Sequence, residues 1–145
     1  MSDFQNFSVG YQVTRAAHHF DRALARALQP LGLSPGQFPT LLALWHHDGQ
    51  SQAELVRAVG VEQATLALTL NRMERDGLIR REPNPKDSRS RLIYLTRLAK
   101  GLEHPAIAAA AQVNARALAD VTDEEAEQFL ALTARIITTL RHGTE

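Results

Sequence analysis

Three basic side chains, Lys86, Arg89 and Arg91, lie on or beside a polar segment at residues 83–90. The prolines and small polar residues of this segment predict a hairpin loop, which would carry the cations away from the protein surface. Cations in such a position bind phosphate or enter a narrow, electronegative groove of a nucleic acid. Asp87, two positions before Arg89, could hold the guanidinium extended and reduce the entropy lost on binding. A solvated basic hairpin is the alternative interpretation.

A second set of candidate residues lies in the stretch at residues 62–76, which has the spacing of an amphipathic helix. On a helical wheel Leu66, Leu70 and Met73 share one face, which predicts that they point into a core. The other residues of interest point away from that face: Gln63, Ala64, Thr65, Leu68, Asn71, Arg72 and Arg75. Asn and Gln can pair with adenine, Arg can reach guanine or phosphate, and Ala and Leu can contact thymine methyl groups. An ordinary surface helix with a solvated polar face is the alternative.

The distribution of charge separates this region from the rest of the chain. Over 145 residues the formal net charge is zero. Residues 57–100, however, hold ten Lys and Arg against five Asp and Glu, whereas the remainder holds six against eleven. A basic segment within a neutral chain indicates one surface suited to phosphate.

The elements that must position these residues can be traced from cap and turn signals. Apolar residues at helical spacing predict a first helix over residues 10–29, ended by Pro30 and Gly32. Ser34 as N-cap and Pro35 in the first turn predict a second helix that ends at residues 48–49.

Ser51 and Glu54 form a capping box, which predicts a short third helix at residues 52–58. Gly60 ends it, and the amphipathic helix at about 62–76 follows. Apolar, β-prone runs at residues 78–81 and 92–95 then flank the polar loop and predict a hairpin.

The C-terminal third returns to helix. Residues 106–119 are rich in Ala, with Pro105 expected to start or kink the helix, and Thr122 is the expected N-cap of a last helix. Small residues permit close helix approach, and the apolar seam of the last helix suits a partner helix. These features predict a homodimer.

A helix, a short turn, a second helix and a two-stranded hairpin follow one another in the order of a winged helix-turn-helix. We therefore expect a mainly α fold with a small β-hairpin wing. In such folds the second helix of the pair enters the major groove of DNA and the hairpin approaches the backbone or the adjacent minor groove.

Residues 33–96 resemble the central block of the MarR/SlyA family of bacterial transcriptional regulators. Asp87-Ser88-Arg89 matches the Asp-x-Arg pattern of the family's wing, and Leu95-Thr96 matches its closing Leu-Thr. The segment VTDEEAEQFLALTARIITTL at residues 121–140 is similar to the family's C-terminal dimerisation helix, and the first helix also fits. The resemblance covers nearly the whole chain.

The resemblance implies a single domain over residues 1–145. A winged lobe at 34–96 would lie between dimerisation helices at 1–30 and 98–145, and two lobes of a homodimer would bind a palindromic DNA operator. Arg89 would be the minor-groove arginine and Asp87 its orienting partner, while Thr65 would contact phosphate. Ser51, Gln52 and Ser88 complete the expected DNA interface.

One residue departs from the family pattern. Position 68 is often polar or basic in such proteins, and here it is Leu68. Its methyl groups would suit thymine, with Gln63 or Asn71 contacting adenine, or it would lie over the groove without touching a base.

The resemblance further implies a repressor that a small aromatic or phenolic acid releases from DNA. The expected effector pocket would draw on His18, His19, Arg22, Phe38, Trp45 and His46. Aromatic residues such as Phe38 and Trp45 are more often part of a core than of a ligand site. The chain has six histidines, and none are spaced as metal ligands on one helical face. Histidines that are distant in the sequence could still converge in a dimer, so a metal- or pH-responsive regulator using histidines is an alternative. A winged-helix module that binds only protein is another.

Several classes of protein are not expected. The chain has no cysteine, which excludes disulfides and thiolate chemistry. It shows neither a membrane-spanning run nor a signal peptide, which predicts a cytoplasmic location. Gly-rich phosphate loops and nucleophile motifs are also missing, so we expect neither an enzyme nor a cofactor or metal.

Overall fold

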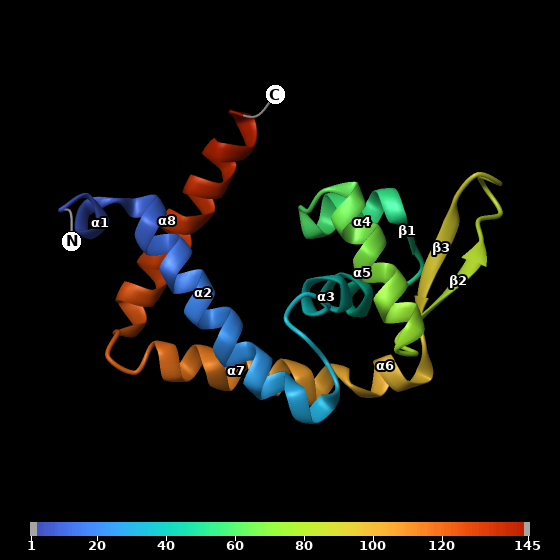
Figure 1. Ribbon diagram of the computed structural model, residues 1–145, viewed down its shortest axis with the longest axis horizontal. Coiled ribbons are helices and arrows are strands. Elements are labelled where there is room, and N and C mark those ends of the chain that lie inside the picture. The colour runs from blue at the N-terminus through green and yellow to red at the C-terminus, as the bar shows by residue number, and fades with distance from the viewer. Residues whose placement is uncertain (1–2, 144–145) are drawn as a thin grey trace. The chain divides into compact units, whose positions relative to one another are not determined.

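The computed structural model describes residues 3–143, which are helical for most of their length and carry one small sheet (Figure 1). The chain separates into two compact units, one up to Ala110 and the other from Ala111 onward. The expected mainly α fold with a β-hairpin wing is confirmed.

The N-terminal part of the first unit consists of α1 (Phe4–Phe7), α2 (Val9–Leu28) and a 3-10 turn, η1 (Gln29–Leu31). The prediction of a helix over residues 10–29 matches α2 to within a residue at each end. Ser8 is its N-cap, because the side-chain oxygen accepts a hydrogen bond from the Tyr11 N–H at 3.2 Å.

The next helix, α3 (Phe38–His46), begins later than its cap signals predict. Residues 34–37 form a turn instead, in which the Gln37 N–H donates to the Ser34 carbonyl at 3.1 Å. The Ser34 N–H in turn donates to Oε1 of Gln37 at 3.2 Å. Ser34 therefore belongs to a turn that the Gln37 side chain closes, and it does not cap the helix. Pro39, and not Pro35, lies in the first turn of the helix.

The helix-turn-helix is formed by α4 (Gln52–Val59) and α5 (Gln63–Arg75). The predicted capping box is confirmed, since Oγ of Ser51 accepts from the Glu54 N–H at 3.2 Å while Oε1 of Glu54 accepts from the Ser51 N–H at 3.4 Å. Gly60 ends α4 with a φ of 76°, a left-handed conformation that favours glycine.

The sheet has the strand order β1-β3-β2, with β1 (Gln50–Ser51), β2 (Ile79–Pro83) and β3 (Arg91–Leu95) all antiparallel to their neighbours. The hairpin β2–β3 is the predicted wing. Strand β1 was not expected, because two residues carry no readable alternation. It is held by the buried Gln50 side chain, whose Nε2 donates to the carbonyls of Ala43 and His47 at 3.0 and 2.6 Å.

The core of the lobe lies between these helices and the sheet. It contains fully or almost fully buried side chains from each of them: Leu41 and Leu44 of α3, Leu55 of α4, Leu66, Leu70 and Met73 of α5, and Ile79, Ile93 and Leu95 of the sheet. Burial of each such side chain stabilises the fold by about 1.5–3 kcal/mol, which anchors the helix pair and the wing to one another.

After the wing come α6 (Arg97–Gly101) and α7 (Glu103–Ala117), the latter with residues in both units, and then α8 (Asp123–His142). Pro105 lies in the first turn of α7. Thr122 caps α8 as predicted, together with Glu125. None of the helices in residues 3–143 has the length and apolarity needed to cross a membrane.

Asp76 ties the end of α5 to the turn before α3. Its Oδ1 accepts from Nε of Arg75 at 3.1 Å, and its Oδ2 accepts from Nε2 of Gln37 at 2.9 Å. These two hydrogen bonds, that of Arg75 foremost, lower the pKa of the Asp76 carboxyl below its ordinary value.

The lowered pKa of Asp76 predicts a pH-dependent contribution to stability. A carboxyl whose pKa is depressed in the folded state stabilises the fold above its unfolded pKa of about 3.9, and loses that contribution as the pH falls through the folded value. Asp76→Asn should therefore unfold at lower urea concentration than the parent at pH 7, and the difference should shrink below about pH 4. Asp120→Asn, at an exposed carboxylate, serves as the control. A difference that is constant from neutral to acid pH would contradict this role.

Candidate nucleic-acid interface

The two faces of α5 lie as the helical wheel predicts. Leu66, Leu70 and Met73 have no exposed surface and fix the helix in the core. The opposite face is exposed: Gln63, Ala64, Thr65, Leu68, Asn71, Arg72 and Arg75. Leu68 is 59% exposed, a large apolar side chain that packing within the lobe does not explain.

The N-terminal turn of α5 has backbone donors without a capping side chain. Glu62 occupies the N-cap position but makes no side-chain cap hydrogen bond. The exposed residues Gln63 and Thr65 lie in this turn. Helix N-termini of this kind suit a phosphate group, because free N–H groups and the helix dipole both favour an anion.

The polar side chains of α5 differ in how far they are already engaged. Arg72 has no hydrogen-bond or ion-pair partner among the described residues, and Arg75 is paired with Asp76 on the surface. Asn71 is bound from the wing, because a terminal nitrogen of Arg81 donates to its Oδ1 at 3.1 Å. Sequence reasoning missed this role of Arg81, since nothing in the spacing places a strand residue against a helix residue ten positions earlier.

The wing loop is ordered by its own side chains. Nδ2 of Asn84 donates to Oγ of Ser90 at 2.9 Å, and Oδ1 of Asn84 accepts from the Lys86 N–H at 3.0 Å. Oδ1 of Asp87 accepts from the backbone N–H of Arg89 at 3.0 Å. The partner of Asp87 is thus the backbone N–H of Arg89, whereas the sequence predicted its guanidinium.

Two cations at the wing tip remain free for a ligand. Within residues 3–143 the exposed side chains of Lys86 and Arg89 make no hydrogen bond or ion pair. Ser88 is exposed beside them. Arg91, by contrast, donates to the carbonyl of Arg81 at 3.2 Å and so is engaged within the hairpin, next to the loop.

Other polar residues near the site serve the fold. The hydroxyl of Ser51 is engaged with Glu54 in the capping box, and the adjacent Gln52 is half-buried. Arg80 lies 4.9 Å from the ring centre of Tyr94 and 3.1 Å from a carboxylate oxygen of Glu82. The free positive charge is therefore displayed at the wing tip and on α5 rather than along the strands.

The predicted effector residues differ in their surroundings. His18, His19 and Arg22 are exposed on α2. Phe38 and Trp45 pack edge to face with ring centres 6.1 Å apart, and Nε1 of Trp45 donates to the Ala99 carbonyl at 3.0 Å.

His46 lies at a pocket of about 480 Å³ between α3 and α4, which Leu42, Gln50 and Val59 also line. Phe38 and Trp45 are not among the lining residues of this pocket. In the part of the chain that the structure describes, no three side chains of the kind that ligate metals come together.

Comparison with known proteins shows what this arrangement is similar to. Residues 33–90 match the model of the MarR family. A probable transcriptional regulator from Pseudomonas aeruginosa is 27% identical, with a TM-score of 0.84 over 90% of this chain and 98% of that one.

Two structures with DNA are also similar. A mutant MarR from E. coli complexed with operator DNA is 22% identical, with a TM-score of 0.86 over 94% of this chain and 99% of that one. The transcriptional repressor CouR, bound to a 23-mer duplex, is 24% identical, with a TM-score of 0.85 over 94% and 98%. They share the fold of this chain across nearly its whole length.

The matched family is one of transcriptional regulators and not of enzymes, in agreement with the expectation from sequence. The match over residues 33–90 contains both helices of the helix-turn-helix and the first strand of the wing. Through its winged helix-turn-helix, this chain matches the MarR family model over residues 33–90 and is similar in fold to a probable transcriptional regulator.

Proposed function

We propose that the protein is a homodimeric repressor in which each winged lobe binds one half of a palindromic operator. Helix α5 enters the major groove with its exposed face, and the wing tip reaches the neighbouring minor groove. The observation that carries this proposal is the joint anchoring of both elements. The core side chains of α5 and of β3 belong to one buried cluster, so the free cations of the wing stand at a fixed position relative to the outer face of α5.

The residues of the proposed interface divide by task. Thr65 and the free N–H groups of the first turn of α5 bind phosphate and set the register of the helix. Leu68 and Arg72 face the base edges. Arg89 enters the minor groove, while Lys86 adds a phosphate contact. Asp87 acts by folding the loop from which Arg89 projects.

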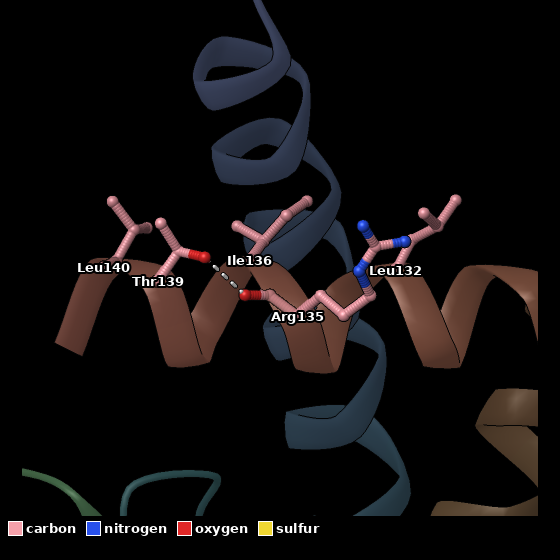
Figure 2. Close-up of a pocket in the computed structure, with 5 residues that line it drawn as sticks. All are labelled: Leu132, Arg135, Ile136, Thr139 and Leu140. Carbon is pink, nitrogen blue, oxygen red and sulfur yellow. Dashed lines mark hydrogen bonds between the residues drawn. The ribbon is translucent and has the colours of Figure 1, made fainter. Parts of the chain in front are cut away.

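Dimerisation is supported by the apolar surface that the terminal helices display. No residue of α8 is buried, although Phe129, Leu130 and Ile137 are each more than half exposed. Figure 2 shows Leu132, Ile136 and Leu140 projecting from one side of this helix, where they line a pocket of about 320 Å³. Apolar side chains at this density on a surface mark an interface, and we assign it to a second copy of the chain.

Release by a small aromatic or phenolic acid is the regulatory part of the proposal. The pocket beside His46 is bounded by α3 and by α4, the helix that precedes α5. An acid seated there would have the imidazoles of His46 and His47 as donors and apolar walls from Leu42 and Val59. A ligand that binds the DNA-free arrangement better than the DNA-bound one would shift the population away from the operator.

The wing arginine provides the first test of DNA binding. Arg89→Ala should weaken operator binding by about 1–3 kcal/mol, because it removes a cation from a narrow groove without touching the core. Fluorescence anisotropy with a selected operator duplex at several salt concentrations measures the loss. Lys86→Ala should lower the salt slope by about one, the signature of a lost phosphate contact.

Arg116→Ala, which removes an exposed arginine of α7 outside the basic segment, is the matched control and should bind as the parent does. Parental affinity in Arg89→Ala would remove the wing from the interface. DNA binding that is weak and independent of salt would instead favour a winged-helix module that binds only protein.

Assembly can be tested separately from DNA binding. We expect a dimer at micromolar concentration by light scattering, with about 2,000 Å² or more of total buried surface, as in obligate pairs. The double substitution of Leu132 and Ile136 by Asp should yield monomers, because two carboxylates in an apolar interface are left without partners. Glu127→Ala, on an already polar position of α8, is the control. A parent that is monomeric at that concentration would overturn the assignment.

Leu68 provides a test of base recognition. Selection from a random DNA pool should yield a T/A-rich position where Leu68 points, since its methyl groups suit thymine. Leu68→Arg should shift that position towards guanine, whose O6 and N7 accept a bidentate pair. The substitution should leave stability unchanged because the side chain is 59% exposed. An unchanged preference would mean that Leu68 lies over the groove without contacting a base.

A further inference from the structure

Arg81 bridges the wing and the outer face of α5. It lies on β2 opposite Ile93, and its side chain is 21% exposed. One terminal nitrogen donates to Oδ1 of Asn71 at 3.1 Å, and the other lies 3.4 Å from Oε1 of Glu74. The carbonyl of Arg81 accepts from Arg91, so the strand that carries the guanidinium is itself braced.

This contact determines what Asn71 can offer to a ligand. A carboxamide has one oxygen that accepts and one NH2 group that donates. Bidentate pairing with adenine needs both, because the oxygen must accept from N6 while the nitrogen donates to N7. Oδ1 of Asn71 is turned towards Arg81, and a positive charge at 3.1 Å opposes the approach of a second donor. Oδ1 of Asn71 thus keeps only one lone pair, beside a positive charge, whereas the NH2 group has no partner among the described residues.

We propose that Arg81 is a positioning residue for base recognition, which holds Asn71 as a hydrogen-bond donor so that the base facing Asn71 is guanine and not adenine. This inference rests on the proposed insertion of α5 into the major groove. Guanine presents two acceptors there, O6 and N7, whereas adenine presents N7 beside a donor that the oriented amide does not accept.

The proposal revises the expectation for Asn71 from sequence. An exposed Asn on this face can pair with adenine as well as with guanine when its amide is free to rotate. Arg81 removes that freedom, and adenine recognition then belongs to Gln63, whose exposed side chain has no partner among the described residues.

Selection from a random DNA pool with four proteins tests the inference. The parent should prefer guanine over adenine by roughly tenfold at one symmetry-related position of each half-site. Asn71→Ala should lose the preference at that position alone. Arg81→Met, which keeps the bulk of the side chain without its donors, should change the preference there to adenine. Glu74→Gln removes the ion pair but keeps the Arg81–Asn71 contact, and should prefer the parental base.

The double variant of Arg81→Met with Asn71→Ala shows whether Arg81 acts through Asn71. It should have the base preferences of Asn71→Ala alone. Should Arg81→Met merely weaken binding to every sequence equally, Arg81 would be a structural brace and the inference would be wrong.

Modified bases test the same point from the DNA side and need no substitution of Arg81. Replacement of the guanine by 7-deazaguanine removes the N7 acceptor and should weaken binding of the parent several-fold, but not that of Asn71→Ala. Equal loss in both proteins, or in neither, would overturn the inference. A parent that binds no sequence selectively would instead contradict the proposed function itself.

Discussion

The burial of Leu66, Leu70 and Met73 is the constraint on which the interface depends. These three side chains have no exposed surface, and they fix the rotation of α5 about its own axis. A helix that presents a defined row of residues to a groove must be held in this way, because a turn of one residue would replace the whole row. The same cluster includes Ile79, Ile93 and Leu95 of the wing, so the apolar core sets the position of both elements of the proposed interface at once.

Polar contacts refine what the core has positioned. The side chains of Asn84 and Asp87 make hydrogen bonds within the wing loop, to the Ser90 hydroxyl and to two backbone N–H groups. The exposed cations of Lys86 and Arg89 therefore stand on a loop with little entropy still to lose on binding. Arg81 joins the wing to the outer surface of α5. The lobe therefore carries both free charges, which suit phosphate, and engaged ones, which orient their neighbours. A count of basic residues does not distinguish these two kinds.

Local signals predicted most of the fold and part of the site. The capping box at Ser51, the N-cap at Thr122 and the buried face of α5 follow from short-range chemistry, and the structure agrees with them. The predicted start of α3 was wrong because Gln37 closes the preceding turn through its side chain. The Ser-Pro signal gives no indication of this contact.

The contacts that sequence reasoning missed connect residues across the fold. The partners of Arg81 and Asp76 are set by how the wing and the helices pack, and no spacing rule reveals them. The edge-to-face contact of Phe38 with Trp45 and the hydrogen bond from Trp45 to the Ala99 carbonyl likewise could not be predicted from spacing.

Methylation interference on a selected operator tests the central claim most directly, because it distinguishes the two grooves in one experiment. Methyl groups at guanine N7 lie in the major groove, and those at adenine N3 lie in the minor groove. The account predicts two clusters of major-groove interference related by the operator's symmetry, each with minor-groove interference beside it where Arg89 enters. Interference confined to one groove, or to one half of the operator, would contradict a dimer that inserts α5 and the wing together.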